Sequence, residues 1–149
     1  MPTKAGGRRK KGRVREGAAE PRWVTRAQLD AIHQAQLSEH GGSAGVRDEG
    51  LLESALNRAR NKFAYGETDL SVLAAAYAFG LAKNHGFIDG NKRTAFQAMY
   101  VFLGLNGSDL SVGEPEVVDV MNRLASGKLT EAAFATWVRA HVAPAADRP

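Results

Sequence analysis

Two strongly apolar segments dominate the pattern of hydrophobic and polar positions along the chain. The first, Leu70–Ala82, is apolar almost all round, which is typical of a helix buried on every side. The second, Thr94–Leu105, is similar, and Asn106-Gly107 after it is typical of a helix C-terminus. We therefore expect a central pair of buried helices joined by the short polar stretch between them.

Weaker amphipathic patterns on either side of this pair predict four more helices. Thr25 and Gln28 have capping-box spacing, Asp48 is suited to cap a helix, and Pro115 suits a first helical turn. The expected ranges are residues 26–40, 49–60, 114–126 and 130–141. Together with the central pair they predict an all-α fold, a compact bundle of about six helices.

Two segments between these helices have a less regular pattern. Residues 61–69 are expected to be a connector, in which Phe63, Ala64 and Tyr65 could form a short strand or flap over the polar stretch, or could anchor the loop to the core. Asp69 is a suitable N-cap for the first central helix. Residues 110–112 are expected to be briefly extended.

Composition limits the class of protein. A chain of 149 residues with 44% hydrophobic residues predicts one domain with a sizeable core. The absence of cysteine excludes disulfides and thiolate zinc sites. No uninterrupted apolar run reaches the roughly 18 residues of a membrane span, and no apolar segment follows the basic N-terminus as in a secretory signal. We expect a cytoplasmic protein without a membrane-spanning segment.

The positive charge is concentrated at the N-terminus. Seven of the 20 Lys and Arg residues lie within residues 1–15, which leaves 13 against all 16 acidic residues and a formal charge of −3 for residues 16–149. The pattern predicts a disordered basic tail over residues 1–20, a folded domain over 21–142 and a disordered C-terminal tail over 143–149. The basic tail could contact nucleic acid weakly, or could serve only as a solubilising extension.

The polar stretch between the central helices holds the groups that chemistry needs. Its candidate residues are His85, Asp89, Asn91, Lys92 and Arg93. A neutral imidazole can take a proton from a hydroxyl, a carboxylate can hold Mg²⁺ together with phosphate oxygens, and a helix start near two cations favours an anion. This combination favours phosphoryl transfer, which depends on positioning and charge stabilisation rather than on a covalent nucleophile.

Less specific interpretations of these residues remain open at this point. His85 and Asp89 could merely satisfy each other in a turn. His33, near the inner stripe of the first helix, is of a kind more often packed and hydrogen-bonded than catalytic. Arg47 lies in a glycine-rich loop, from which it could reach a carboxylate or a phosphate, or could simply be solvated.

The run HGFIDGNKR, residues 85–93, resembles the active-site motif of the Fic/Doc superfamily. It has the form of the death-on-curing (Doc) branch, H-x-F-x-[D/N]-[A/G]-N-K-R, rather than the Fic form that ends G-N-G-R. The segments GGSAGVRDEGLLESAL, FAYGE, LAAAYAFGLAKNH and VFLGLNG also stand in the order and spacing of Doc-like toxins. The resemblance covers about residues 23–142 and implies a Fic/Doc-like bundle.

The resemblance also implies an activity. Fic proteins generally transfer AMP from ATP to a hydroxyl of a target protein, whereas Doc-branch proteins transfer the γ-phosphate to a threonine of elongation factor Tu and arrest translation. It makes His85 the base and Asp89 the Mg²⁺-binding, phosphate-orienting acid. The implied nucleotide- and phosphate-binding residues are Lys83, Gly90, Asn91, Lys92, Arg93 and Gln97.

Three positions depart from the pattern that many relatives share. Gly86 stands where proline is common, which predicts a looser loop. Lys83 stands where arginine is frequent, and Gln97 stands where some members have asparagine.

Lys92 replaces the second glycine of the Fic motif, which fits a nucleotide bound with its γ-phosphate towards His85. An AMP transferase on the same scaffold, or a non-enzymatic binding module, is the alternative to a kinase. Doc-like toxins are paired with an antitoxin, whose disordered segment folds into a groove on the toxin.

Overall fold

The fold is mostly helical, as predicted, with one very small pair of antiparallel strands. A computed structural model describes residues 19–145, so the predicted basic tail lies almost wholly outside the described residues, as do residues 146–149. The elements are α1 (Arg26–His40), α2 (Glu49–Ala64), α3 (Leu70–Asn84), α4 (Asn91–Leu105), β2 (Ser108–Leu110), α5 (Glu114–Ala125), α6 (Glu131–His141) and β3 (Val142–Pro144). No helix within the described part of the chain is long and apolar enough to cross a membrane.

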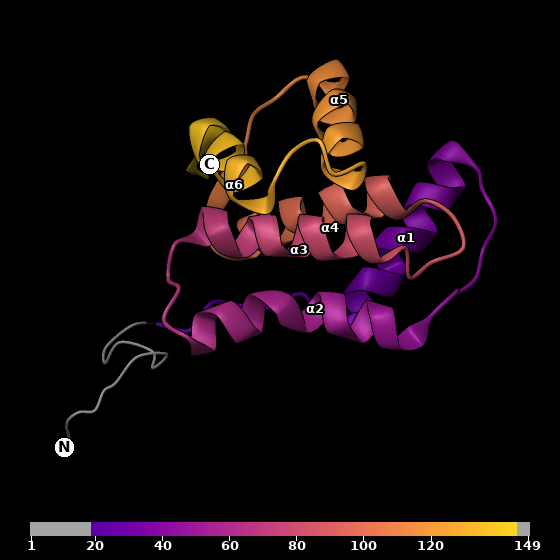
Figure 1. The fold of residues 1–149 in the computed structure, drawn as a ribbon, viewed down its shortest axis with the longest axis horizontal. Helices are drawn as coiled ribbons and strands as arrows, with labels where there is room; N and C mark the ends of the chain where they lie inside the picture. Colours follow the sequence, from indigo (N-terminus) through magenta and orange to yellow (C-terminus); the bar gives the residue numbers. More distant parts are fainter. Residues whose placement is uncertain (1–18, 146–149) are drawn as a thin grey trace, which may run out of the picture.

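Helix α3 forms the centre of the molecule. It packs against α2 on one side and α4 on the other, and α5 and α6 lie across the pair (Figure 1). Ten of its 15 residues are buried, which confirms the prediction of a helix enclosed on every side. Tyr77 is fully buried and packs beside Phe102 of α4, while its hydroxyl accepts a hydrogen bond from the Val24 N–H at 3.1 Å. The central pair therefore carries much of the core.

Side-chain caps explain where four of the helices begin. The predicted capping box of Thr25 and Gln28 is present at α1, and Asp48 accepts a hydrogen bond from the Leu51 N–H at α2. Asp69 and Thr130 cap α3 and α6 in the same way. Each cap satisfies a backbone donor that has no partner within the helix.

Helix α2 is longer than the sequence pattern predicted. It continues through residues 61–64, which were expected to belong to a connector, because Phe63 lies on the same face as Leu52, Leu56 and Ala59 and is buried with them. Phe63 is thus an anchor in the core, and the alternative of a strand or flap is wrong. Tyr65 follows the helix and is 77% exposed.

The C-terminal end is also more ordered than predicted. Ala143 and Pro144 were expected in a disordered tail, but they lie in β3, which pairs antiparallel with β2. The pairing is extended by a hydrogen bond from the Ala145 N–H to the Gly107 carbonyl at 2.9 Å. The extended piece expected at residues 110–112 occurs as β2, shifted two residues towards the N-terminus. The two strands are over 30 residues apart and are separated by α5 and α6, so their pairing leaves no local signal in the sequence.

Candidate active site

The loop between α3 and α4 lies at one end of the molecule, beside α1 and the beginning of α2 (Figure 1). His85 ends α3 in a left-handed conformation, with φ 51° and ψ 50°. Among the residues that the structure describes, it is the only non-glycine residue with a positive φ. This conformation is uncommon for a residue with a Cβ, so the surroundings must hold it in place.

The loop is attached to the core through Phe87. Phe87 is 3% exposed, and its ring stacks on His33 of α1 with ring centroids 3.7 Å apart. His33 is itself buried, and its Nε2 lies 2.9 Å from the Asp89 carbonyl oxygen, which accepts the hydrogen bond. The prediction that His33 is packed and hydrogen-bonded is therefore confirmed.

Asn91 fixes the same loop from the other side. Its amide oxygen accepts a hydrogen bond from the Phe87 N–H at 3.0 Å, and its amide nitrogen donates one to the Phe87 carbonyl at 2.9 Å. Both polar atoms of this buried side chain are thus bonded to the loop backbone. What Asn91 can still present to an anion is its backbone N–H at the start of α4 and the second N–H of its side-chain amide.

Gly86 packs closely against α2, and its contacts give no sign of the looser loop that the sequence predicted. The residue is buried, and a Cβ built on it would lie 2.6 Å from Leu52 Cγ, so no side chain fits there without movement of Leu52. Its carbonyl accepts hydrogen bonds from the N–H groups of Arg47 and Asp48, at 2.7 and 3.0 Å. The glycine allows a close approach of the loop to α2.

Asp89 is held in its charged form by backbone donors. Its Oδ2 accepts from the Ser43 N–H at 3.1 Å and its Oδ1 from the Gly90 N–H at 2.9 Å. These two bonds, with smaller contributions from the charges of Arg93 and His33, hold the pKa of the Asp89 carboxyl below its usual value. Within residues 19–145 the His85 ring has no hydrogen bond, so the alternative of a simple His85–Asp89 pair is wrong.

The N-terminus of α4 is open. Its N-cap residue Gly90 has φ 77° and provides no side-chain hydrogen bond, and the first turn contains no acidic residue. Within residues 19–145, Lys92 and Arg93 are exposed and form no hydrogen bond or ion pair through their side chains. Two unpaired cations beside unbonded helix amides make an environment that an anion would stabilise.

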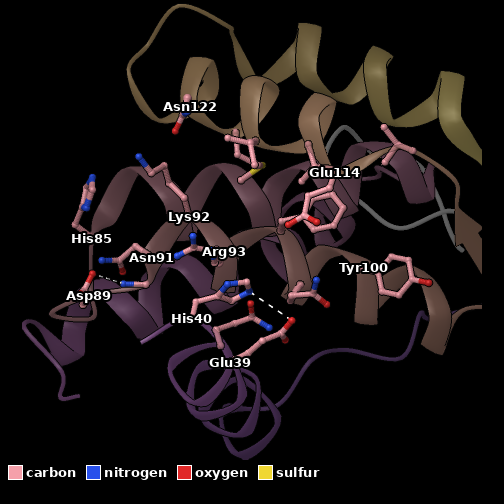
Figure 2. Close-up of a pocket in the computed structure, with 18 of the residues that line it drawn as sticks. Glu39, His40, His85, Asp89, Asn91, Lys92, Arg93, Tyr100, Glu114 and Asn122 are labelled. Carbon is pink, nitrogen blue, oxygen red and sulfur yellow. Dashed lines mark hydrogen bonds and ion pairs between the residues drawn. The ribbon is translucent and has the colours of Figure 1, made fainter. Parts of the chain in front are cut away.

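A groove of about 850 Å³ runs from this loop along α4, between the end of α1 on one side and β2 and α5 on the other. Figure 2 shows His85, Lys92 and Asn122 at one end of the groove and Tyr100 at the other. Its polar end contains His85, Asp89, Gly90, Asn91, Lys92, Arg93 and Gln97. Its apolar lining residues are Phe96, Tyr100, Leu110, Val112, Val117, Val118 and Met121. We call the part around Tyr100 the apolar end, although Glu114 also lines the groove there (Figure 2). The volume is in the range of pockets that bind small molecules and cofactors.

Comparison with known proteins identifies the family of this chain. The sequence model of the Fic/DOC family matches residues 23–103, which include the whole loop. The chain belongs to the Fic/Doc family. It is 34% identical over 119 residues to "Protein kinase doc" of Escherichia phage P1, covering 79% of this chain and 94% of that protein. It is 42% identical over 93 residues to "Toxin Doc" of Mycolicibacterium smegmatis (strain ATCC 700084 / mc(2)155), covering 58% of this chain and 69% of that protein.

One predicted phosphate ligand of this Fic/Doc protein lies away from the groove. The Nζ of Lys83 is 3.4 Å from the Ala125 carbonyl oxygen at the end of α5, and Lys83 is not among the residues that line the groove. It lies on the last turn of α3, where its side chain contacts α5 rather than the loop. The other predicted site residues all line the groove.

Other groove residues of this Fic/Doc protein were not predicted. Gln36, Glu39 and His40 come from the last turns of α1, and Asn122 comes from α5. The sequence pattern places them on helices without indicating a role in the site, and only the packing of α1 and α5 against α4 brings them there. No local signal in the sequence could have identified them.

The residues present fit Mg²⁺ held together with a polyphosphate. Within residues 19–145 there is no group of three or more His, Cys, Asp or Glu side chains that could hold a metal ion by itself. Asp89 offers one ionised carboxylate, and both of its oxygens keep a free lone pair after accepting one N–H each. Mg²⁺ prefers one or two carboxylates plus substrate phosphates and water, so this donor set suits it.

Proposed function

We propose that this Fic/Doc protein is a Doc-type toxin that acts as a protein kinase. It transfers the γ-phosphate of ATP to a threonine hydroxyl of a translation factor, elongation factor Tu, and thereby inhibits translation. The observation that carries the proposal is Lys92, a cation without a partner within residues 19–145, in the first turn of the uncapped helix α4. The printed names of the two relatives, a kinase and a toxin, support it.

In the proposed reaction His85 is the general base. Its ring nitrogen takes the proton of the target hydroxyl, and the hydroxyl oxygen forms a bond to the γ-phosphorus. The bond from the γ-phosphorus to the β–γ bridging oxygen breaks, and ADP leaves with the electron pair. The imidazole is suited to this role because its ring has no competing hydrogen bond among the described residues.

The open end of α4 binds the phosphates. Lys92 contributes a compact positive charge, and Arg93 can hold two phosphate oxygens with its planar fork. Asp89 would hold Mg²⁺, which supplies charge neutralisation on the phosphate oxygens. The backbone N–H groups of residues 91–93 point along the helix axis towards the same oxygens and require no reorganisation during transfer.

Lys92 also favours γ-phosphate transfer over AMP transfer. In the Fic form of the motif a glycine at this position leaves space for a phosphate within the loop, whereas here the position carries a lysine side chain, which we expect to take that space. A nucleotide in the groove would then place its γ-phosphate towards His85.

The decisive experiment follows two labels in parallel. The purified protein is incubated with purified elongation factor Tu, or with a translation extract, and with ATP labelled at either the α or the γ phosphate. Transfer of the γ label alone supports the kinase. Transfer of the α label alone would overturn it in favour of AMP transfer, and transfer of neither label would favour a binding module. In the same assay Lys92→Ala should lose transfer of the γ label. Lys128→Ala is its matched control and should keep the transfer, because Lys128 is an exposed lysine in the α5–α6 turn.

We further propose that an antitoxin segment binds the apolar end of the groove. An amphipathic helix can lay its apolar face against residues such as Tyr100 and Val118, which are 41% and 53% exposed. Binding there would block the approach of nucleotide or target to the polar end. Co-purification with the product of an adjacent gene, lost on Val118→Asp substitution, would support this partner.

A further inference from the structure

Arg47 contacts the loop at three successive residues. Its Nε donates a hydrogen bond to the His85 carbonyl oxygen at 2.6 Å, and its Nη2 donates one to the Asn84 carbonyl oxygen at 2.9 Å. Its backbone N–H donates to the Gly86 carbonyl oxygen at 2.7 Å. One residue of the α1–α2 loop therefore binds the backbone on both sides of the proposed base.

These contacts meet a need created by the end of α3. The last carbonyls of a helix lack partners within it, and a left-handed residue after them is usually glycine. Here His85 occupies that position although it has a Cβ, with φ 51°. The guanidinium of Arg47 supplies donors to two of the exposed carbonyls and a positive charge at the negative end of the helix dipole.

We propose that Arg47 is a positioning residue, which holds the backbone of His85 in its left-handed conformation and thereby aims the imidazole at the acceptor hydroxyl. The proposal rests on the proposed function, in which His85 is the base. Neither interpretation that the sequence left open for Arg47 describes these contacts, because Nε and Nη2 are directed at backbone carbonyls, so the guanidinium neither reaches a carboxylate or phosphate nor is simply solvated.

The neighbouring contacts show why the loss of Arg47 would affect His85 specifically. Phe87, Asn91 and the bond from Asn84 Nδ2 to the Leu51 carbonyl would still attach the rest of the loop to the core. The two guanidinium bonds are the ones that reach the carbonyls of residues 84 and 85. A lysine could donate to only one carbonyl at a time, because it lacks the planar fork.

The experiment compares Arg47→Ala and Arg47→Lys with Arg58→Ala. Arg58 is a matched control, because it is an arginine on α2 that pairs with Glu131 and lies over the Phe79 ring. We expect kcat to fall about 10- to 100-fold in Arg47→Ala, since small misplacements of catalytic groups have effects of this size. The KM for ATP should stay unchanged in Arg47→Ala. The kcat of Arg47→Lys should lie between those of the wild-type protein and Arg47→Ala. Added guanidinium should restore part of the rate of Arg47→Ala but none of that of His85→Ala.

A second measurement does not depend on activity. The NMR signals of the His85 imidazole should shift or broaden in Arg47→Ala and stay unchanged in Arg58→Ala, with unchanged far-UV circular dichroism spectra showing that the fold is intact. If the wild-type protein transfers no label, the proposed function fails, whereas the His85 signals still test the role of Arg47. An unchanged kcat, a raised KM for ATP at unchanged kcat, or unchanged His85 signals would overturn the inference.

Discussion

The helix starts of this protein fall into two kinds. Helices α1, α2, α3 and α6 begin at a Thr or Asp side chain that accepts a backbone N–H. Helix α4 begins at Gly90 without such a cap, and its first turn carries Lys92 and Arg93 but no acid. Helix α5 also lacks a side-chain cap, but it has Pro115 and two acidic residues in its first turn. Only the α4 start, of these six, combines an open end with positive charge.

This difference indicates what the α4 start is suited for. A cap typically contributes about 1 kcal/mol, and each cation at a helix N-terminus is unfavourable by roughly 0.3–1 kcal/mol. The buried faces of α3 and α4 maintain the helix without these local contributions. The same features that weaken an empty helix start stabilise a bound phosphate, so we interpret the open end as the binding site for the transferred group.

The largest expected effect is on catalysis at the open end. Replacing His85 by alanine removes the proposed base, and the rate of phosphotransfer should fall about 10²–10⁴-fold. The fold should remain, because the side chain is exposed and has no hydrogen bond among the described residues. The measurement is the initial rate of γ-label transfer, together with growth arrest at equal expression. Growth arrest by His85→Ala as strong as that by the wild-type protein would show that the base is misassigned.

The second effect concerns the contact of the loop with α2. A Cβ at Gly86 would overlap Leu52, so Gly86→Ala should lower the free energy of unfolding by about 1–3 kcal/mol. Gly104→Ala in α4 is the control, because a Cβ there meets nothing within 4 Å and alanine favours a helix. Urea denaturation measures both variants.

A double variant sharpens this test. Leu52→Ala alone should destabilise by roughly 2–5 kcal/mol because it leaves a cavity in the core. Combined with Gly86→Ala, it should cost less than the sum of the single effects, since the overlapping side chain is gone. Additive costs would mean that the tight approach of Gly86 to Leu52 is not what excludes a side chain there.

The third effect compares the two kinds of helix start directly. Thr130→Ala removes the cap of α6 and should destabilise by about 1 kcal/mol. Lys92→Met removes a cation from the open start of α4 and should stabilise the nucleotide-free protein by roughly 0.3–1 kcal/mol. Thermal unfolding without nucleotide, at low salt, measures the two changes. A loss of stability in Lys92→Met would mean that the α4 start is not electrostatically strained.

The sequence predicted the fold well because its signals are local. The caps at Thr25, Asp48 and Asp69 lie within three residues of the donors that they satisfy, and the two central helices are apolar over their whole length. The loop residues were predicted for the same reason, since nine consecutive positions hold the motif. Phe63 was missed although it continues the spacing of the buried face of α2.

What could not be predicted depends on contacts between distant segments. The α1–α2 loop runs beside the active-site loop, with Val46 bridged to Phe87 and the Ile88 N–H donating to the Gly45 carbonyl at 3.0 Å. This pairing determines how Arg47 reaches His85 and how Ser43 reaches Asp89. The paired residues are 38 and 46 positions apart along the chain, and their types alone do not indicate that they meet.

The smallest expected effect is the pH dependence of stability at the two kinds of helix start. The pKa of Asp89 is lowered, first by the hydrogen bond from the Ser43 N–H and then by that from Gly90. The pKa of Asp69 is also lowered: burial would raise it, but hydrogen bonds from Arg139 and from the backbone of residues 71 and 72 outweigh burial. A lowered pKa in the folded state means that each carboxylate contributes stability above its unfolded pKa and loses it as the pH falls through the folded value.

Asp89→Asn and Asp69→Asn should therefore each destabilise the protein at neutral pH, and the difference from the wild-type protein should shrink as the pH falls below about 4. Salt distinguishes the two residues. Raising NaCl from about 0.1 M to about 1 M should reduce the contribution of Asp69, whose carboxylate pairs with the exposed guanidinium of Arg139. The contribution of Asp89 should change less, because uncharged backbone donors provide its main stabilisation. Chemical denaturation by urea across pH 2–7 at both salt concentrations measures this, and an equal salt response of the two variants would show that Asp89 depends on Arg93 rather than on the loop backbone.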